Sequence, residues 1–572
     1  MVFPVILPKV AARWLFTFYR AAKKLRRHAF QLYYRNTAAI AKPPPPSSSA
    51  VSQQQAGVAA VAAFNPDAGS AIPNAAGRTI VCDMHGALLR STALFPYFML
   101  VACEGGSLLR AMLLLGAFPL VWALGEQRRG GAGVRVMAFV TFAGLTPRDV
   151  DLVARAVLPK HYMEQLNAVV YGSLWLPARR KVAVTSAPRV MSEWFLKEYM
   201  AADAVVGLEL QHVMIGRRRY FTGLLSGPAT TGPSELRQKA LREALGAEDD
   251  LMADVGIIGH STSPLDQLFV PYCKEVYVVS RESTKNDKLP RDKYPKPLIF
   301  HDGRLAFLPT PAAMLAFFLF LPLGVILSVI RINIGIVLPY KINFAVGAVF
   351  GVRFRVSGLR AAPRAPADDD DGEPQPQQQR RGVLYVCTHR TLVDPIMLST
   401  ALQKPVPALT YSLSRLSELI APIRTVRLTR DRARDAETMS RLLKQGDLAV
   451  CPEGTTCREP YLLRFSPLFA ELADDMEPVA LDAQVTTLYG TTASGHKWLD
   501  PVAFFANPVP SYRVEFLGAV PREWTRAGGR TGVEVANWVQ RRLGEALEFE
   551  CTGLTRRDKY MMLAGNDGVV AK

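Results

Sequence analysis

Apolar runs alternate with polar loops in a first block of the chain, residues 78–304. Three short apolar runs, Thr79–Val81, Val182–Val184 and Val255–Ile258, are separated by stretches long enough for helices. Strands of a parallel sheet are buried on both faces and read as continuous apolar runs. The pattern therefore predicts an α/β fold with an open parallel sheet, and places its chemistry at the carboxyl ends of the strands.

A second block, residues 382–550, repeats this alternation and predicts another α/β domain, followed by a C-terminal tail at 551–572. Its strand candidates are again short and apolar, and helical stretches separate them. They are Val383–Cys387, Ala408–Thr410, Val426–Leu428, Leu448–Cys451 and Val514–Phe516.

Between the blocks, residues 305–330 carry no charged side chain, and Ile332–Phe350 contains only Lys341 as a charge. A run of about 20 apolar residues is long enough to cross a bilayer. We predict one or two transmembrane segments at 305–352, as a hairpin or as one span with an interfacial helix. Two shorter apolar stretches, Phe95–Cys103 and Ala111–Leu124, predict a helical cap that either dips into the membrane or is buried in the core.

The charge of the chain is concentrated at its N-terminus. The chain has 572 residues, 68 Lys+Arg, 50 Asp+Glu and a net charge of +18, yet its first acidic residue is Asp67. Basic and aromatic side chains interleave before residue 43, which is typical of an amphipathic anchor on an anionic membrane and also of a mitochondrial transit peptide. We assign residues 1–77 to this segment and a low-complexity linker. Because the basic residues accompany apolar runs, we expect membrane lipids as partners and no nucleic acid.

Two further compositional features concern linkers and thiols. Residues 353–381 include Asp368–Asp371 and few apolar side chains, which predicts a linker with a disordered acidic insertion. The seven cysteines include no C-x-x-C pair. This pattern supports neither a zinc site nor a disulfide framework, and favours reduced thiols facing a reducing compartment.

The first candidate for catalysis is a His–Asp pair that follows the Val383–Cys387 strand. His389 and Asp394 are five residues apart, which on one ideal helix would place them roughly 140° apart. They meet only if His389 lies in a loop and Asp394 in the first helical turn. A histidine held by a carboxylate can act as a general base. Cys387 lies two residues before His389, so a covalent thiol mechanism is an alternative.

Three more segments accompany this pair in the second block. Ala421–Arg430 is basic and ends in Arg430, and Cys451–Arg458 reads C-P-E-G-T-T-C-R. Arginine at a strand end suits bidentate binding of phosphate, and a glycine allows close backbone approach to a ligand. Glu477–Ala480 begins another apolar strand. In this order the segments resemble the four motifs of the glycerophosphate/lysophosphatidate acyltransferase superfamily.

The resemblance is closer to the land-plant glycerol-3-phosphate acyltransferases, whose C-terminal motif is matched by Leu554–Gly568. It implies transfer of an acyl group from acyl-CoA to glycerol 3-phosphate, at sn-2 in that family, releasing lysophosphatidate for membrane lipid or cutin- and suberin-type polyesters. His389 and Asp394 would be catalytic, without an acyl-enzyme. The residues implied to bind substrate are Arg430, Glu453, Gly454 and Thr455, with Arg458 replacing an arginine that the superfamily has where this chain has Thr456.

In the same family the N-terminal domain resembles haloacid-dehalogenase-type phosphatases, which need carboxylates around Mg²⁺. Here His85 and His260 stand where two of those carboxylates belong, and a hard Mg²⁺ ion prefers oxygen ligands. We predict an inactive phosphatase-like domain with no metal, although Asp83 and the two histidines could instead form a transition-metal site. The degenerate site comprises Asp83, His85, Thr185, Ser186, Lys239, His260 and Asp266.

Rival functions are an acyltransferase for another lysolipid acceptor and a phosphatase or phosphotransferase acting through Asp83. We expect no cofactor beyond acyl-CoA as co-substrate. Because both substrates are cytosolic, we expect an integral membrane protein of the endoplasmic reticulum with His389 on the cytosolic side. A mitochondrial membrane is the alternative that the basic N-terminus leaves open.

Overall fold

The structure is a computed structural model. It describes the backbone of residues 61–64 and residues 75–125, 131–226, 233–246, 252–259, 269–279, 288–359, 382–410, 418, 421–429 and 431–566. The chain forms two compact units. One contains residues up to 298 together with 308–319, and the other contains 299–307 together with 320–572. The predicted N-terminal anchor and the acidic insertion at 361–381 lie outside the described residues, apart from the short strand at 61–64 and residues 75–77.

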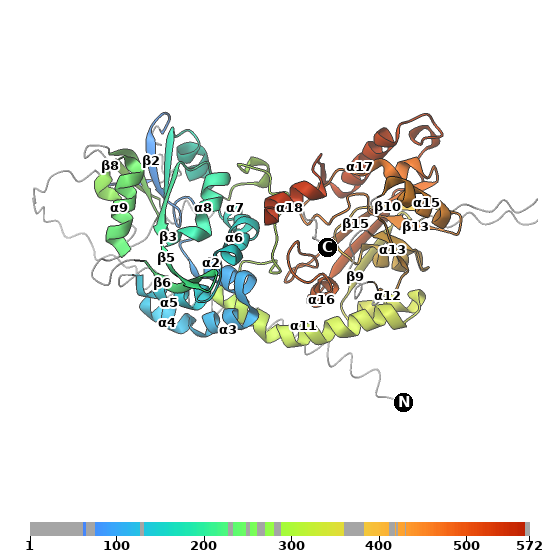
Figure 1. The fold of residues 1–572 in the computed structure, drawn as a ribbon, viewed down its shortest axis with the longest axis horizontal. Coiled ribbons are helices and arrows are strands. Elements are labelled where there is room, and N and C mark those ends of the chain that lie inside the picture. The colour runs from blue at the N-terminus through green and yellow to red at the C-terminus, as the bar shows by residue number, and fades with distance from the viewer. Residues whose placement is uncertain are drawn as a thin grey trace, which may run out of the picture. The chain divides into compact units, whose positions relative to one another are not determined.

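The first unit is built on a six-stranded parallel sheet, as the apolar runs predict (Figure 1). Its strand order is β1-β8-β7-β2-β3-β4. The three predicted strands are β2, β3 and β7, and β2 has a nearly continuous buried pattern. The strands are β1 (Val61–Phe64), β2 (Thr79–Asp83), β3 (Arg180–Pro188), β4 (Ala204–Leu208), β7 (Ala253–Ile258) and β8 (Cys273–Val279).

Helices inserted between β2 and β3 form the predicted cap. Helix α2 (Phe95–Leu100) is buried throughout, so this stretch belongs to the core. By contrast, α3 and α4 leave Leu109, Leu113 and Trp122 more than half exposed. The insertion has further helices, and two more helices lie between later strands of the sheet. They are α3 (Leu108–Gly116), α4 (Phe118–Leu124), α5 (Ala132–Phe142), α6 (Pro147–Ala156), α7 (Leu158–Met163), α8 (Arg189–Glu198) and α9 (Pro233–Leu245), with a hairpin of β5 (Leu210–Ile215) and β6 (Arg218–Leu225).

The central apolar stretch forms two successive helices, α11 (Pro311–Val337) and α12 (Tyr340–Val349). Among the described residues, α11 alone is long and apolar enough to cross a membrane, judged by length and composition. Helix α12 has 10 residues, which at 1.5 Å per residue spans about 15 Å, half of a hydrocarbon core. A second straight helical span is therefore not formed here.

The second unit is built on a seven-stranded sheet of order β12-β11-β13-β10-β15-β16-β9. All neighbouring pairs are parallel except β15 and β16, which are antiparallel. All five predicted strands form. The strands are β9 (Arg353–Ser357), β10 (Leu384–Cys387), β11 (Ala408–Thr410), β12 (Thr425–Arg427), β13 (Leu448–Val450), β15 (Met476–Gln484) and β16 (Ser511–Phe516).

Helices cover this second sheet, and two apolar clusters pack between them and the strands. One cluster joins α15 and α17 to β10, β13 and β15, while the other joins α13 to β10, β15 and β16. The helices are α13 (Asp394–Leu402), α15 (Arg432–Leu443), α16 (Leu499–Phe505), α17 (Gly532–Leu547) and α18 (Arg556–Ala564), and β14 (Tyr461–Leu462) pairs with β17 (Glu550–Cys551).

Two boundaries differ from the sequence interpretation. Residues 353–357, assigned to a linker, form edge strand β9 because they pair in parallel with β16. Ile299–Phe307, assigned to the first domain up to residue 304 and to the membrane segment from 305, belongs to the second unit, where Arg304 forms an ion pair with Asp500. Neither boundary was visible in the local pattern, because both depend on partners more than 150 residues away.

Candidate active site

His389 and Asp394 meet where β10 ends and α13 begins. The strand stops at Cys387, His389 lies in the following loop, and Asp394 is the first residue of α13. The His389 Nδ1 atom lies 2.9 Å from Asp394 Oδ2. The geometric condition derived from the sequence, a loop histidine and a first-turn carboxylate, is therefore met. The His389 side chain keeps 18% of its surface exposed, whereas that of Asp394 has none.

Asp394 is held by donors from several directions. Its Oδ2 accepts from the Arg390 backbone N at 2.6 Å, and its Oδ1 accepts from the Thr391 hydroxyl at 2.7 Å. The hydroxyl of Tyr512, a buried residue of β16, also donates to Oδ1. These hydrogen bonds fix the orientation of the Asp394 carboxylate. Asp394 is thus fixed in place as the acceptor for Nδ1, which leaves Nε2 of His389 as the nitrogen that can take up a proton.

Glu453, on the loop after β13, supports the same histidine from its backbone. Its Oε1 accepts from the His389 backbone N at 2.7 Å, and its Oε2 accepts from the Leu463 backbone N at 3.0 Å. Burial raises the pKa of Glu453 to about 7. Both carboxylate oxygens therefore accept hydrogen bonds from backbone N–H groups. Glu453 positions the His389 loop rather than presenting its oxygens to a ligand.

Arg390 joins the His389 loop to the loop after β13. Its guanidinium donates to the carbonyls of Glu459 at 2.8 Å and Arg458 at 2.6 Å, and it stacks over Phe549. In addition, the Thr388 hydroxyl donates to the Leu481 carbonyl of β15 at 2.7 Å. The catalytic loop is therefore tied to its neighbours on both sides.

The thiol of Cys451 lies close to the catalytic pair. Donor atoms of His389, Asp394 and Cys451 lie within 4.8 Å of one another, a spacing that suits one metal ion. The Asp394 oxygens, however, already accept from five groups, and burial raises the pKa of the Cys451 thiol well above its usual value. Metal ligation needs a free carboxylate and a thiolate. The donor set therefore suits a proton carrier better than a metal.

The thiol that sequence reasoning singled out, Cys387, is 1% exposed. Burial raises its pKa far above neutrality as well. The nucleophilic form of cysteine is the thiolate. The burial of Cys387 therefore argues against the covalent alternative.

Gly454 and Thr455 form the tip of the loop after β13. Gly454 is exposed, has φ of +65° and has no atom within 4 Å of the position a Cβ would take. Only glycine adopts this conformation without strain, and the open space admits a ligand close to the backbone. Thr455 is buried, and its hydroxyl accepts from Lys559 of α18 at 3.4 Å. Gly454 is thus the accessible part of this loop.

Arg458 is not placed to bind an exposed phosphate. Its side chain is 8% exposed, forms an ion pair with Asp302 at 3.2 Å and lies over the ring of Tyr489. Asp302 belongs to Ile299–Phe307, the segment whose place in the second unit the sequence did not reveal. The interpretation of Arg458 as a substitute phosphate ligand is therefore not supported by its contacts. Arg430, the other predicted phosphate ligand, lies outside the described residues.

In the first unit, Asp83 and His85 lie at the carboxyl end of β2. The His85 backbone N lies 3.4 Å from Asp83 Oδ1, and its Nδ1 lies 3.4 Å from the Thr185 hydroxyl. Burial lowers the pKa of His85 to about 3, so its imidazole is neutral at physiological pH. A neutral histidine supplies neither the charge that Mg²⁺ prefers nor a proton for a leaving group. The described part of this cluster therefore places one carboxylate, Asp83, beside a neutral imidazole and the Thr185 hydroxyl.

The remaining residues of that degenerate site do not all lie near Asp83 and His85 in the described structure. Ser186 is buried next to Thr185 on β3, while Lys239 is exposed on α9. His260 and Asp266 lie outside the described residues. The structure thus brings together Asp83, His85 and Thr185, and does not describe the late acidic motif.

Comparisons with known proteins agree with this two-part architecture. Residues 79–279 match the family described as "Glycerol-3-phosphate acyltransferase RAM2-like, HAD-like domain", and residues 353–488 match the family "Acyltransferase". "Glycerol-3-phosphate acyltransferase 1" of Arabidopsis thaliana is 50% identical over 503 residues, which cover 86% of this chain and 82% of that protein. The chain belongs to the plant glycerol-3-phosphate acyltransferase family.

Two further members of the family match over nearly their whole length. "Glycerol-3-phosphate acyltransferase RAM2" of Petunia hybrida is 43% identical over 487 residues, covering 85% of this chain and 97% of that protein. "Probable glycerol-3-phosphate acyltransferase 2" of Arabidopsis thaliana is 43% identical over 502 residues, covering 86% and 90%. The resemblance stated from the motifs is confirmed, and so is the α/β architecture with a phosphatase-like first domain.

Sequence reasoning missed four residues of the site: Tyr512, Arg390, Cys451 and Lys559. Tyr512 lies before the predicted strand Val514–Phe516, whereas in the structure β16 starts at Ser511 and Tyr512 is buried. Arg390, Cys451 and Lys559 stood inside motifs without a role of their own. Their contacts with the catalytic loops come from distant strands and helices, so no local pattern marked them.

Proposed function

We propose that this protein transfers an acyl group from acyl-CoA to a hydroxyl of glycerol 3-phosphate. The observation that carries the proposal is the 2.9 Å contact between His389 Nδ1 and a buried Asp394, at the carboxyl end of β10. A histidine oriented in this way can remove a proton from a substrate hydroxyl. The family to which the chain belongs supplies the identity of the acceptor.

The proposed reaction proceeds in one transfer. His389 Nε2 takes the hydroxyl proton, and the oxygen attacks the thioester carbonyl carbon of acyl-CoA. The tetrahedral intermediate then breaks its carbon–sulfur bond, and the departing CoA sulfur takes the proton from the imidazolium. Asp394 stabilises that imidazolium between the two proton transfers. No acyl-enzyme is required, in keeping with the buried, neutral Cys387.

The product is proposed to keep its phosphate, as lysophosphatidate. A phosphatase step would need an acidic or carboxylate group where His85 stands, and burial keeps His85 neutral with a pKa of about 3. Transfer to the sn-2 hydroxyl and a role in cutin- or suberin-type polyesters stay predictions from the family resemblance. Chromatographic separation of the sn-1 and sn-2 isomers of the product checks the first of these.

The test uses membranes that contain the full chain, labelled glycerol 3-phosphate and a panel of acyl-CoAs. We expect labelled lysophosphatidate from the wild type and its loss in His389→Ala. His496→Ala is the matched control, since His496 is exposed and lies outside the catalytic loop. Full activity of His389→Ala would contradict the proposed mechanism. Labelled monoacylglycerol that disappears in Asp83→Asn would indicate a phosphatase, and product formed only from added lysophosphatidate would indicate another acceptor.

We also propose that α11 lies along the membrane surface instead of crossing the bilayer. Its C-terminal half is fastened to the acyltransferase unit, because Ser328 donates to the Val502 carbonyl at 2.9 Å and the buried Arg331 donates to the carbonyls of Phe350, Phe505, Asn507 and Pro508. Val325, Ile326 and Val329 of the same half are exposed. One face is thus bound to protein while the other is apolar and open.

Neighbouring residues support a membrane surface as the occupant of that open face. Helix α12 exposes Ile342, Phe344 and Val349, and the adjoining strand β9 exposes Arg353 and Arg355. Arginines beside an apolar helix can reach anionic lipid head groups while the helix enters the acyl boundary. This arrangement keeps both ends of the 305–352 segment on the cytosolic side, where the substrates are.

Two measurements test the membrane proposal. Flotation with vesicles should weaken for Ile326→Asp combined with Val329→Asp, and stay unchanged for Val533→Asp, an equally exposed apolar residue of α17. Protease sites engineered after Gly303 and after Gly358 should both be cut from the outside of sealed microsomes. Protection of one site alone would establish a membrane span instead.

A further inference from the structure

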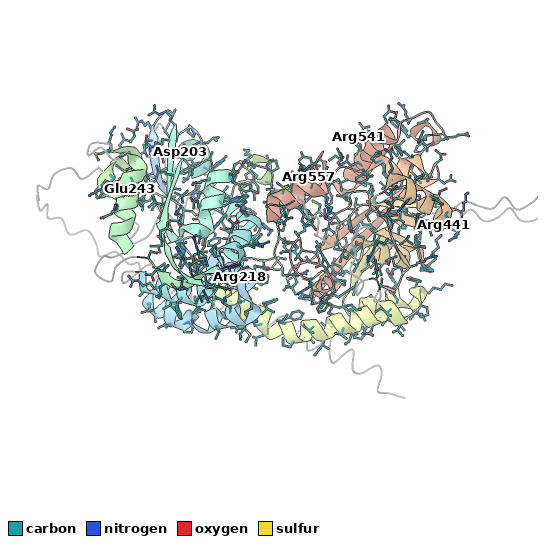
Figure 2. All side chains as sticks on the ribbon, viewed as in Figure 1. Asp203, Arg218, Glu243, Arg441, Arg541 and Arg557 are labelled. Atoms are coloured by element: carbon teal, nitrogen blue, oxygen red, sulfur yellow. The ribbon has the colours of Figure 1, made fainter. Side chains whose placement is uncertain are left out.

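The C-terminal tail motif, which the proposed mechanism does not use, delivers a buried lysine to the acyltransferase loops. Helix α18 starts with a capping box in which Thr555 and Asp558 exchange hydrogen bonds, so the helix is fixed at its first turn. Lys559 follows directly and is 6% exposed. Arg557, two residues earlier on the same helix, is exposed (Figure 2). The helix therefore turns one specific basic side chain inward.

The ammonium of Lys559 binds the loop after β13. Its Nζ lies 2.5 Å from the Thr456 carbonyl, 3.3 Å from the Thr456 hydroxyl and 3.4 Å from the Thr455 hydroxyl. An ammonium has three N–H donors, and three acceptors surround it here. Lys559 has no proton left for a substrate phosphate, so these contacts fit a residue that holds the loop.

This loop in turn holds the catalytic histidine. The backbone N of Cys457, the residue after Thr456, donates to the His389 carbonyl at 3.0 Å. The Thr456 hydroxyl also lies 2.9 Å from the Thr491 hydroxyl. A short path of hydrogen bonds therefore runs from Lys559 through residues 456 and 457 to the backbone of His389.

Among the residues that the structure describes, none forms an ion pair with Lys559. The charged groups around it are Arg458 and Lys497, of its own sign, and Asp302, which is already bonded to Arg458 and Ser494. Burying a lysine in such surroundings is unfavourable, and an apolar side chain of similar shape would stabilise the fold at least as well. A function for the ammonium explains its presence better than stability does.

We propose that Lys559 is a positioning residue of the acyltransferase reaction, which fixes residues 455–457 and through them the place of His389. The inference rests on the proposed function. It also gives the tail motif a role, because the motif places the lysine at the loop. The residue acts through the loop and His389, not on the substrate.

The test compares purified full-length variants with saturating and limiting substrate. In Lys559→Met we expect kcat to fall about 10- to 100-fold, because a small misplacement of a catalytic group costs up to that factor. We expect KM for both substrates to change less than about threefold, and the melting temperature to stay equal or rise. Lys559→Arg, which keeps the charge and the donors, should recover most of the lost kcat. Arg557→Met is the matched control on the same helix.

Several outcomes would overturn the proposal. These are a Lys559→Met enzyme with wild-type kcat, a loss confined to KM for glycerol 3-phosphate, or a loss that follows a lowered melting temperature. Lys559→Gln, which keeps two N–H donors without charge, is measured beside it in case the Met variant is not recovered folded, and should have an intermediate kcat. If the wild type is inactive and His389→Ala changes nothing, the proposed function fails instead.

Discussion

The hydroxyl of Tyr512 donates a hydrogen bond to Asp394, whose carboxylate orients His389. The two residues are 118 positions apart, and they meet because β16 lies beside β15 while α13 covers the same sheet. Burial raises the pKa of Tyr512 well above its usual value, so the phenol stays a donor at any physiological pH. The orientation of the general base His389 therefore depends, through Asp394, on Tyr512, which lies outside the linear motif.

Tyr512→Phe should lower kcat by about 3- to 10-fold. A hydrogen bond to a charged group contributes about 1.5–3 kcal/mol, and the other donors to Asp394 retain part of that support. Initial rates at saturating substrates check this, with Tyr385→Phe, another buried tyrosine of the same unit, as the control. An unchanged kcat would show that the backbone and Thr391 donors suffice to hold Asp394.

Asp394→Asn should lower kcat far more, by about 10³- to 10⁴-fold. The amide can present an N–H to His389 Nδ1, which favours the tautomer in which Nε2 carries a proton and cannot accept one. The fold should persist, since Asn is nearly isosteric with Asp. Activity within tenfold of the wild type, in protein with an unchanged circular dichroism spectrum, would contradict the role given to Asp394.

The sequence was sufficient to predict two α/β sheets and the condition under which His389 and Asp394 can meet. Both follow from local rules: apolar runs become buried strands, and polar residues after parallel strands converge at one edge. The requirement for a loop histidine and a first-turn aspartate was geometric, and β10 and α13 satisfy it.

The roles of charged residues could not be predicted from the same rules. Glu453 and Arg458 look like ligand groups in a motif, but Glu453 binds two backbone amides and Arg458 binds Asp302. Those partners lie on segments far away in the sequence, such as Ile299–Phe307, whose hydrophobic pattern gives no sign of the contact. Lys559, which lay in the tail motif without an assigned role, is buried in the structure.

Glu453→Gln should lower kcat by about 10- to 100-fold. A glutamine has one acceptor oxygen, so its NH₂ would face either the His389 or the Leu463 backbone N–H, and an unpaired buried donor costs about 1–3 kcal/mol. The same assay with Glu437→Gln, an exposed residue of α15, is the control. If both variants behave alike, the contacts of Glu453 do not set the position of His389.

The wild type should also lose activity as pH rises through about 8, and Lys559→Arg should move this loss to higher pH. Burial, the largest cause, lowers the pKa of Lys559 from 10.5, its value in an exposed peptide, to about 8. The positive charges of Lys497 and Arg458 add to this shift, while Asp302 and Cys457 partly oppose it. Deprotonation leaves two N–H donors for three acceptors and turns a lone pair toward one of them. An arginine stays charged throughout this range.

Stability should respond to the same titration with the opposite sign. Between pH 8 and 10.5 the unfolded chain binds the Lys559 proton more tightly than the folded chain, so the contribution of this group to folding stability rises with pH. Activity that falls while the melting temperature is maintained or rises therefore separates loss of positioning from unfolding. Profiles of kcat and melting temperature from pH 6.5 to 10 for the wild type, Lys559→Arg and Arg557→Met test this. An alkaline limb shared by all three would assign it to a group other than Lys559.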